Sequence, residues 1–207
     1  MFNWLKKKDK IKPATWSDIT LDKFYELQDI LSVQDEYTLC NLIDLVYGID
    51  SADMPVSELS KYTIEFLSNP IDNKNVKLED IYTINGRKYS SNINLTSVTT
   101  AQFIDYSNYC KEENKHFEKL LSVFFIPEGH NYNDGYNMSE VQQDLLQLDI
   151  VTVQSLAVFM IKQFQLFALT FQQSLVEELK TMNLTPEKKQ IIEETLKLMN
   201  LGYSQSL

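Results

Sequence analysis

Histidine and cysteine, the residue types that build most zinc centres and catalytic triads, are scarce in this sequence. Its only histidines are His116 and His130, and its only cysteines are Cys40 and Cys110. Structural zinc sites need several such ligands together, and catalytic triads need a histidine beside a nucleophile. His116 is predicted to lie solvated on a polar helix face, and His130 has no cysteine near it in the chain. No metal site is therefore expected.

The segment "NYNDGYN" (131–137) is dense in oxygen ligands and could be a calcium loop. An EF-hand loop with Gly135 at its sixth position would place Val141 where the bidentate glutamate belongs, so the match fails. Asparagine and glycine are also the residues that turns with positive φ favour. The segment is therefore predicted to be a turn-rich loop, held on the fold by Tyr132 and Tyr136.

Other signatures of catalysis are missing as well. The five glycines are scattered, whereas a phosphate cradle needs a glycine cluster that opens a helix after a strand. No serine lies in a G-x-S-x-G elbow. Carboxylate pairs such as Glu177-Glu178 and Glu193-Glu194 fall on helical segments with apolar opposite faces, which is typical of solvated surfaces. The sequence predicts neither an enzyme nor a cofactor.

Charge is distributed unevenly along the chain. The net charge of −10 argues against nucleic-acid binding through the phosphate backbone, which needs a basic face. The exception is residues 1–15, where Phe2, Trp4 and Leu5 precede the lysines at positions 6, 7, 8, 10 and 12. In one interpretation this basic arm is a solvated terminus that packs its aromatic side chains on a neighbour. In the other it docks on an acidic partner surface or near packaged DNA.

Neither a signal peptide nor a membrane span is expected. No apolar h-region follows the first lysines. The most apolar run, residues 149–171, carries Lys162, Gln163 and Gln165 near its middle, whereas a spanning helix needs about 20 predominantly apolar residues. The two cysteines lie far apart in segments predicted to be helical, which indicates reduced thiols and synthesis in a reducing, intracellular place.

Residues 16–70 are predicted to form a unit of short amphipathic helices. The first follows Thr20 as N-cap, and the second ends at Gly48. The third has Pro55 in its first turn and ends before Pro70. Helical spacing predicts a core for the third helix that consists of Val56, Leu59, Tyr62, Ile64 and Leu67.

Residues 71–98 change to a β-hairpin pattern. Asn85-Gly86 separates two short β-prone runs, and this dipeptide favours a type I′ turn because both central residues need positive φ. A lone hairpin is marginally stable, so we expect it to lie on the helices or on a neighbouring subunit.

Residues 99–207 are predicted to form a C-terminal helical bundle. Thr99 and Gln102 have capping-box spacing, and so do Asn137 and Glu140. One helix is expected to run up to Pro127. The longest is expected over 151–182, with a seam of Met160, Phe164, Phe167, Phe171 and Leu175, and a final helix from Thr185 to near Gly202. The predicted fold class is mainly α, a helical bundle with a long central helix near the C-terminus and a small β-hairpin insertion.

Several stretches of packing and turn residues resemble proteins from the structural gene blocks of bacteriophages that infect gut Bacteroidetes, including the crAss-like phages. They are "WSDITLDKFYELQDI" (16–30), "LIDLVYGID" (42–50), "MPVSEL" (54–59), "TTAQFIDY" (99–106) and "LLSVFFIPEGHNYNDGYNMSEV" (120–141). None of them is a catalytic signature. The resemblance implies a small helical protein of the virion, made in the host cytoplasm and placed at the portal–tail region.

The role implied by this resemblance is a head–tail connector that forms a homo-oligomeric ring. Its partners would be the portal protein and neighbouring ring or tail proteins. Sequence-specific nucleic-acid binding and membrane binding are not expected. The alternatives are a tail-assembly chaperone that leaves before the particle is complete, a virion cargo protein, or a bacterial helical adaptor. We expect the loop Pro127–Asn137 to offer backbone and tyrosines to an adjacent subunit. The candidate interface residues are Trp4, Lys6, Lys7, Lys8, Asn85, Gly86, Arg87, Pro127, Tyr132 and Tyr136.

Overall fold

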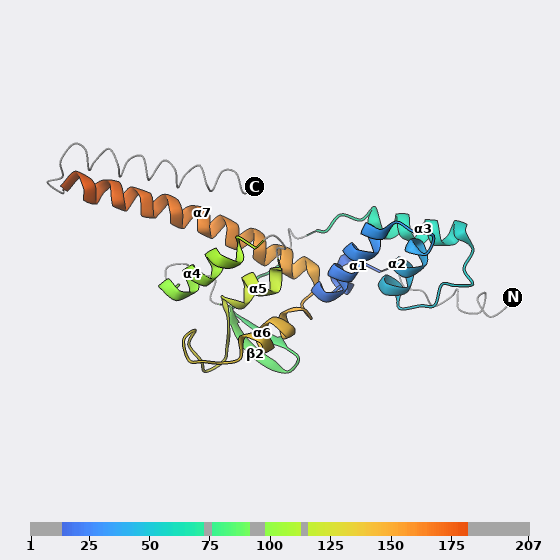
Figure 1. Ribbon diagram of the computed structural model, residues 1–207, viewed down its shortest axis with the longest axis horizontal. Coiled ribbons are helices and arrows are strands. Elements are labelled where there is room, and N and C mark those ends of the chain that lie inside the picture. Colours follow the sequence, from blue (N-terminus) through green and yellow to red (C-terminus); the bar gives the residue numbers. More distant parts are fainter. Residues whose placement is uncertain (1–13, 73–75, 92–97, 113–115, 182–207) are drawn as a thin grey trace. The chain divides into compact units, whose positions relative to one another are not determined.

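The computed structural model describes residues 14–72, 76–91, 98–112 and 116–181. The described part is mainly helical with a small three-stranded antiparallel sheet (Figure 1), which confirms the predicted fold class at this level. Contacts divide the chain into two compact units. The first comprises 1–93 and 98–157, and the second comprises 94–97 and 158–207.

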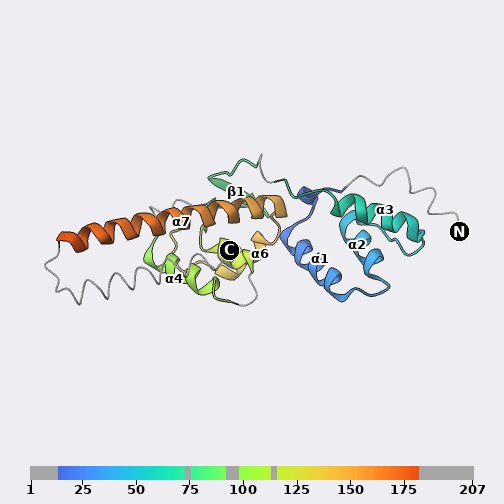
Figure 2. The same ribbon diagram turned by 90° about the horizontal axis from the view of Figure 1, so that it is seen from above.

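The first helices lie side by side in the first unit (Figures 1 and 2). They are α1 (Leu21–Val33), α2 (Thr38–Tyr47) and α3 (Val56–Leu67). The Thr20 side chain accepts from the N–H of Lys23 at 3.4 Å, and Gly48 caps α2 with φ of 64°. Both predicted caps are confirmed, because each signal is local. Pro55 is the N-cap of α3 and not a first-turn residue.

The predicted core of α3 is wrong in part. Its buried side chains are Leu59, Thr63 and Phe66, whereas Val56, Ile64 and Leu67 are exposed. Apolar positions fit two overlapping faces of this helix, and spacing alone does not show which face turns inward. In the structure the buried face packs against α2, and the ring of Trp16, from the 3₁₀ turn Trp16–Asp18, lies with its centroid 4.5 Å from that of Phe66.

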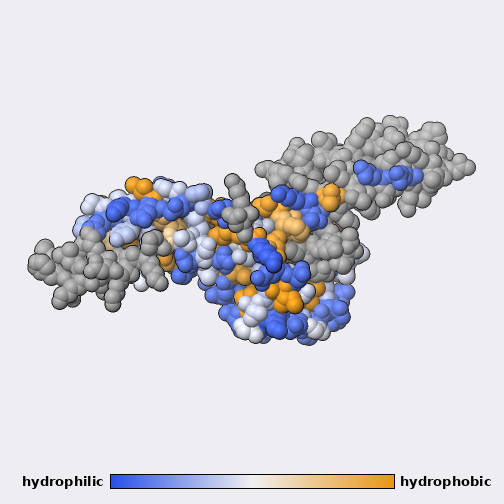
Figure 3. All heavy atoms as spheres, turned by 180° about the vertical axis from the view of Figure 1, so that it is seen from behind, coloured by the Kyte–Doolittle hydropathy of each residue, from blue (hydrophilic) through white to orange (hydrophobic). Residues whose placement is uncertain are grey.

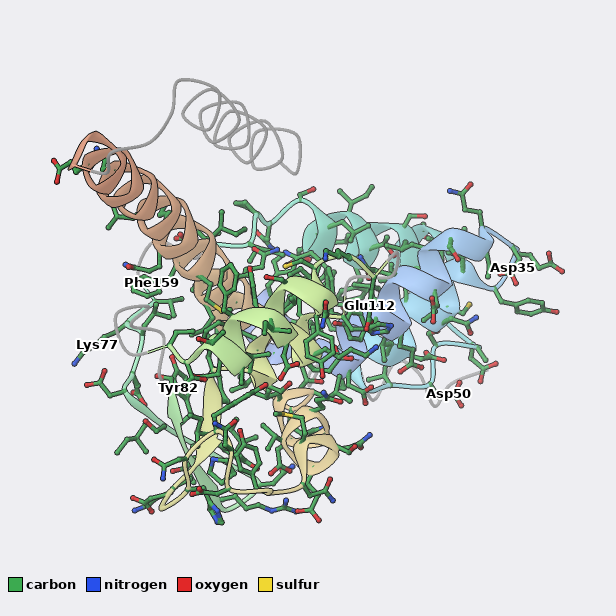
Figure 4. The ribbon with its side chains drawn as sticks, turned by 60° about the vertical axis from the view of Figure 1, so that its left-hand side comes forward. Asp35, Asp50, Lys77, Tyr82, Glu112 and Phe159 are labelled. Carbon is green, nitrogen blue, oxygen red and sulfur yellow. The ribbon has the colours of Figure 1, made fainter. Side chains whose placement is uncertain are left out.

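The hairpin forms as predicted. β1 (Ile81–Ile84) pairs antiparallel with β2 (Arg87–Ser91), and the turn residues Asn85 and Gly86 have φ of 50° and 77°. One face of the hairpin is buried and the other is exposed, as expected for a sheet that covers helices on one side. Tyr82, labelled in Figure 4, lies on the buried face with its ring 5.2 Å from that of Phe125.

A third strand occupies a segment predicted to be helical. The helix expected to reach Pro127 ends early, because α5 covers only Phe117–Ser122. β3 (Phe125–Pro127) follows and pairs antiparallel with β2, so that the sheet order is β1-β2-β3. A short apolar run fits a buried strand as well as a buried helix, and pairing to the hairpin selects the strand.

Of two further helices, α4 (Thr100–Tyr109) packs on α5 and α6 (Met138–Leu145) packs on α5 and β3. α4 begins with the predicted capping box, in which Thr99 N–H donates to Gln102 Oε1 at 2.9 Å. α6 begins at Asn137, whose side chain accepts from Ser139 N–H at 3.1 Å. The second predicted capping box is wrong, because Glu140 forms an ion pair with the hairpin residue Arg87 and does not reach back to Asn137.

The last described helix, α7, spans Ile150–Thr181. Its start is joined to the start of α1 by main-chain hydrogen bonds, Leu21 N–H to Leu148 O at 2.8 Å and Ile150 N–H to Ile19 O at 2.8 Å. Of the predicted seam, Met160 is buried, and the side chains of Phe164, Phe167, Phe171 and Leu175 lie outside the described residues, as does the predicted final helix. Among the described helices, none has the length and apolarity to cross a membrane.

Candidate interaction surface

The tip of the hairpin is fixed to α6 through one buried carboxylate. Asp144 accepts hydrogen bonds from Asn85 Nδ2 at 3.0 Å and from the hydroxyl of Tyr89. The Arg87 guanidinium, from the only arginine of the sequence, lies 2.8 Å from Glu140 Oε2 and 3.5 Å from Asp144 Oδ2. These five residues form a turn–helix network that joins positions more than 50 residues apart.

The electrostatics of this network favour a single arrangement. The side chain of Asp144 is only 5% exposed, and a buried carboxylate is tolerated when hydrogen-bond donors and a cation surround it. Burial and the hydrogen bond to Asp144 raise the pKa of Tyr89 to about 12. The neighbouring Asp144 also raises the pKa of Arg87. The hydroxyl and the guanidinium therefore remain donors at physiological pH.

The loop Pro127–Asn137 continues from β3 at the same end of the sheet. Glu128 N–H donates to Lys88 O at 2.9 Å, and Lys88 Nζ lies 3.8 Å from Glu128 Oε2. Within the loop, Asn131 N–H donates to Asp134 Oδ2 at 2.6 Å. Figure 1 shows the hairpin, this loop and α6 gathered together. The hairpin and the start of this loop, which are far apart in sequence, are thus joined by these contacts.

The loop tyrosines anchor the loop on the fold. Tyr132 donates its hydroxyl to Asp105 Oδ2 on α4 at 2.7 Å, and burial together with this bond raises its pKa well above the ordinary range. The ring of Tyr136 packs edge-on against His130, with ring centroids 6.0 Å apart. Burial raises the pKa of Tyr136 to about 12, and its buried hydroxyl has no hydrogen-bond partner among the described residues. Both side chains are only partly exposed.

The side chains that the loop does expose come from its polar positions. Glu128, His130 and Asn133 are exposed, as are Asn85, Gly86 and Arg87 at the hairpin turn. We call these six residues the hairpin-end surface. The structure therefore brings the predicted candidates Asn85, Gly86 and Arg87 to the same end of the sheet as Pro127, which pairs with Tyr89. The other candidates, Trp4, Lys6, Lys7 and Lys8, lie outside the described residues.

Sequence reasoning missed Glu140 and Asp144, the acidic half of the network. Both lie on a short polar helix, and nothing in their local spacing indicates a partner on a hairpin far away in sequence. The alternation of Tyr82, Ile84 and Tyr89 toward one face was the available signal, because a buried tyrosine needs a partner for its hydroxyl.

A second polar cluster joins α1 to α5. The Tyr25 hydroxyl donates to Glu118 Oε2 at 2.7 Å and accepts from Phe117 N–H at 2.8 Å. His116 Nδ1 lies 3.1 Å from Glu118 Oε1, and its side chain is 43% exposed, so this histidine is partly solvated and also contacts a carboxylate. Burial and the bond to Glu118 raise the pKa of Tyr25 far above its ordinary value. The cluster ties two helices together through hydrogen bonds.

The exposed polar groups of the hairpin-end surface can form hydrogen bonds and ion pairs. Within the described ranges, no set of three or more histidine, cysteine, aspartate or glutamate side chains is arranged to hold a metal ion. The polar groups of the turn–helix network are paired with one another, and the hairpin-end surface they support combines exposed amide, guanidinium and carboxylate groups. Such a surface can bind a complementary protein through hydrogen bonds and ion pairs.

Comparisons of this chain with protein-family models, with curated proteins and with solved structures find no match. The geometry of the hairpin end is therefore the structural observation on which a functional proposal can rest.

Proposed function

We propose that this chain is a non-enzymatic structural protein of a tailed bacteriophage particle, a head–tail connector subunit that forms a homo-oligomeric ring at the portal–tail region. Its partners are the portal protein, its own copies and neighbouring ring or tail proteins. The resemblance supplies the viral context. The observation that carries the interaction role is the hairpin-end surface, an exposed polar surface whose supporting side chains are bonded to one another.

Rigid support is what makes this surface suited to assembly. Association is weakened by the entropy of ordering loops and side chains at an interface, so a loop that is already fixed binds with less loss. Here Tyr132 is bonded to Asp105, and Arg87 is bonded to Glu140, before any partner arrives. The exposed groups of the loop and turn therefore keep one geometry, which suits repeated identical contacts around a ring.

The net negative charge of the chain also supports a position close to DNA that does not require binding to it. The net charge of −10 gives the protein a field that repels nucleic acid, which limits sticking to DNA that passes through a channel.

We further propose that α7 is the central helix of a C-terminal bundle. Val158 and Ile161 are large apolar side chains on α7 that are exposed, and exposed apolar side chains on a helix favour packing against another helix.

Counting the protein in purified particles tests the proposed role. Quantitative mass spectrometry of particles of the phage that encodes this chain would compare its copy number with that of the portal protein. A ratio near one chain per portal subunit is expected. Absence from the particle would overturn the connector role in favour of an assembly chaperone, and a ratio unrelated to the ring symmetry would overturn it in favour of cargo.

A further inference from the structure

Helix α3 exposes an apolar stripe. Val56, Ile64 and Leu67 are 70%, 64% and 41% exposed. At about 100° per residue these three positions fall within roughly 80° of one another around the helix. Over a rise of ~1.5 Å per residue the stripe is ~16 Å long. It runs along the helix beside the buried face, so α3 has a second apolar side that the described part of the chain leaves exposed.

The stripe belongs to a strongly acidic region. Residues 14–70 contain eleven acidic residues against two lysines, a net charge of −9. Asp35 and Asp50, labelled in Figure 4, are exposed at turns of this region. In Figure 3 the surface of the α1–α3 region is mainly hydrophilic, with smaller apolar patches. A ligand for this region should combine apolar side chains with positive charge.

The first thirteen residues of the same chain have this chemistry. Phe2, Trp4 and Leu5 supply large apolar groups, and five lysines against Asp9 give residues 1–13 a net charge of +4. Aromatic anchors with flanking basic residues are well suited to an apolar stripe within an acidic surface.

The point where this arm leaves the fold is close to α3. Ala14 is buried, and Trp16 Nε1 donates to Asn69 O at 2.6 Å, two residues beyond the end of α3. Thirteen residues span at most ~45 Å when extended, more than twice the ~18 Å length of the helix. A tether of this length gives an effective concentration on the order of millimolar, which favours the arm of the same chain over that of a free second copy.

We propose that residues 1–13 dock on the α3 stripe of their own chain. Phe2 and Trp4 cover Ile64 and Val56, and the lysines face the carboxylates of residues 14–70. The contact is salt-sensitive, because its charges lie at the surface where ions screen them.

Site-specific photocrosslinking in the 207-residue chain tests this contact. Trp4 is replaced by benzoylphenylalanine, and equal amounts of ¹⁴N-labelled and ¹⁵N-labelled chains are mixed, irradiated and digested for mass spectrometry. The expected products join position 4 to α3 peptides that carry the same label. Crosslinks to other elements, crosslinks that join the two labels, or no crosslink to α3 would each overturn the proposal.

A matched pair of variants shows whether the stripe is what holds the arm. Ile64→Ser and Ile104→Ser make the same change at exposed positions of α3 and α4, so neither should affect folding. Ile64→Ser is expected to lower the yield of the α3 crosslink about tenfold, since it removes an apolar contact, and Ile104→Ser should leave it unchanged. Raising the salt from about 0.1 M to about 1 M should also lower the yield. Equal yields from the two variants would contradict the proposal.

Discussion

The hairpin end and the α1–α3 region are held together by different forces. At the hairpin end, polar side chains pair across more than 50 residues, and Asp144 receives Asn85 and Tyr89 at once. In the α1–α3 region, cohesion comes from fully buried apolar side chains such as Leu42, Ile43 and Phe66. The first arrangement fixes the direction of exposed groups, and the second leaves an apolar stripe exposed. One chain can therefore carry one surface preorganised for assembly and another able to accept an arm.

The largest effect is expected from the apolar core of the α1–α3 region. Phe66→Ala should lower the free energy of unfolding by about 3–5 kcal/mol, because Phe66 is fully buried against Trp16. The neighbouring change Leu67→Ala should lower it by less than about 1 kcal/mol, since Leu67 is on the exposed stripe. Urea denaturation followed by circular dichroism measures both. Similar losses for the two variants would mean that the buried face has been assigned wrongly.

The next effect concerns the buried carboxylate of the turn–helix network. Asp144→Ala should lower the free energy of unfolding by about 3 kcal/mol, because Asn85 and Tyr89 lose a buried acceptor and Arg87 loses a counter-charge. Glu140→Ala removes the more exposed carboxylate that contacts Arg87 and should lower it by less than about 1 kcal/mol. The same denaturation experiment compares them. If Glu140→Ala lowered the free energy of unfolding more than Asp144→Ala, the stability of the network would not depend on the buried carboxylate.

A smaller and local effect is expected at the loop. Tyr132→Phe removes only the hydroxyl that bonds Asp105 and should lower the free energy of unfolding by about 1 kcal/mol. Hydrogen exchange of the loop amides should become faster, since the loop loses its anchor. Tyr37→Phe, at a highly exposed tyrosine, is the control and should change neither quantity. Unchanged exchange in Tyr132→Phe would show that other contacts fix the loop.

The last effect appears only in alkali. Tyr89 has a folded-state pKa of about 12 against an ordinary value of 10.0, so its contribution to stability is complete below pH 10 and is lost as the pH rises through 12. The unfolding free energy of the wild-type protein should therefore fall more steeply over this interval than that of Tyr89→Phe. Parallel pH profiles for the two proteins would contradict the buried hydrogen bond to Asp144.

Local signals in the sequence predicted the parts of the fold that depend on few residues. Thr20, Gly48 and Thr99 were identified as caps, and Asn85-Gly86 as the hairpin turn, because each motif satisfies its own backbone groups. The hairpin-turn residues of the candidate surface were found in the same way.

The remaining features depend on partners far away in the chain. β3 became a strand because β2 offers it hydrogen bonds, although the apolar run at 123–127 is equally consistent with a helix. The buried face of α3 packs against α2 and against Trp16, which lies 50 residues earlier than Phe66. Glu140 was assigned to a local capping box, but Arg87 supplied a stronger, charged partner.

The measurement that tests the role of the hairpin-end surface most directly is the copy number of a loop variant in assembled particles. Asn133→Arg enlarges an exposed loop side chain without touching Tyr132 or Tyr136, and Asn108→Arg makes the same change at an exposed site on α4. With both variants folded as judged by circular dichroism, Asn133→Arg should be lost from particles and Asn108→Arg should be incorporated like the wild type. Incorporation of both variants at the wild-type ratio to the portal protein would contradict assembly through this surface.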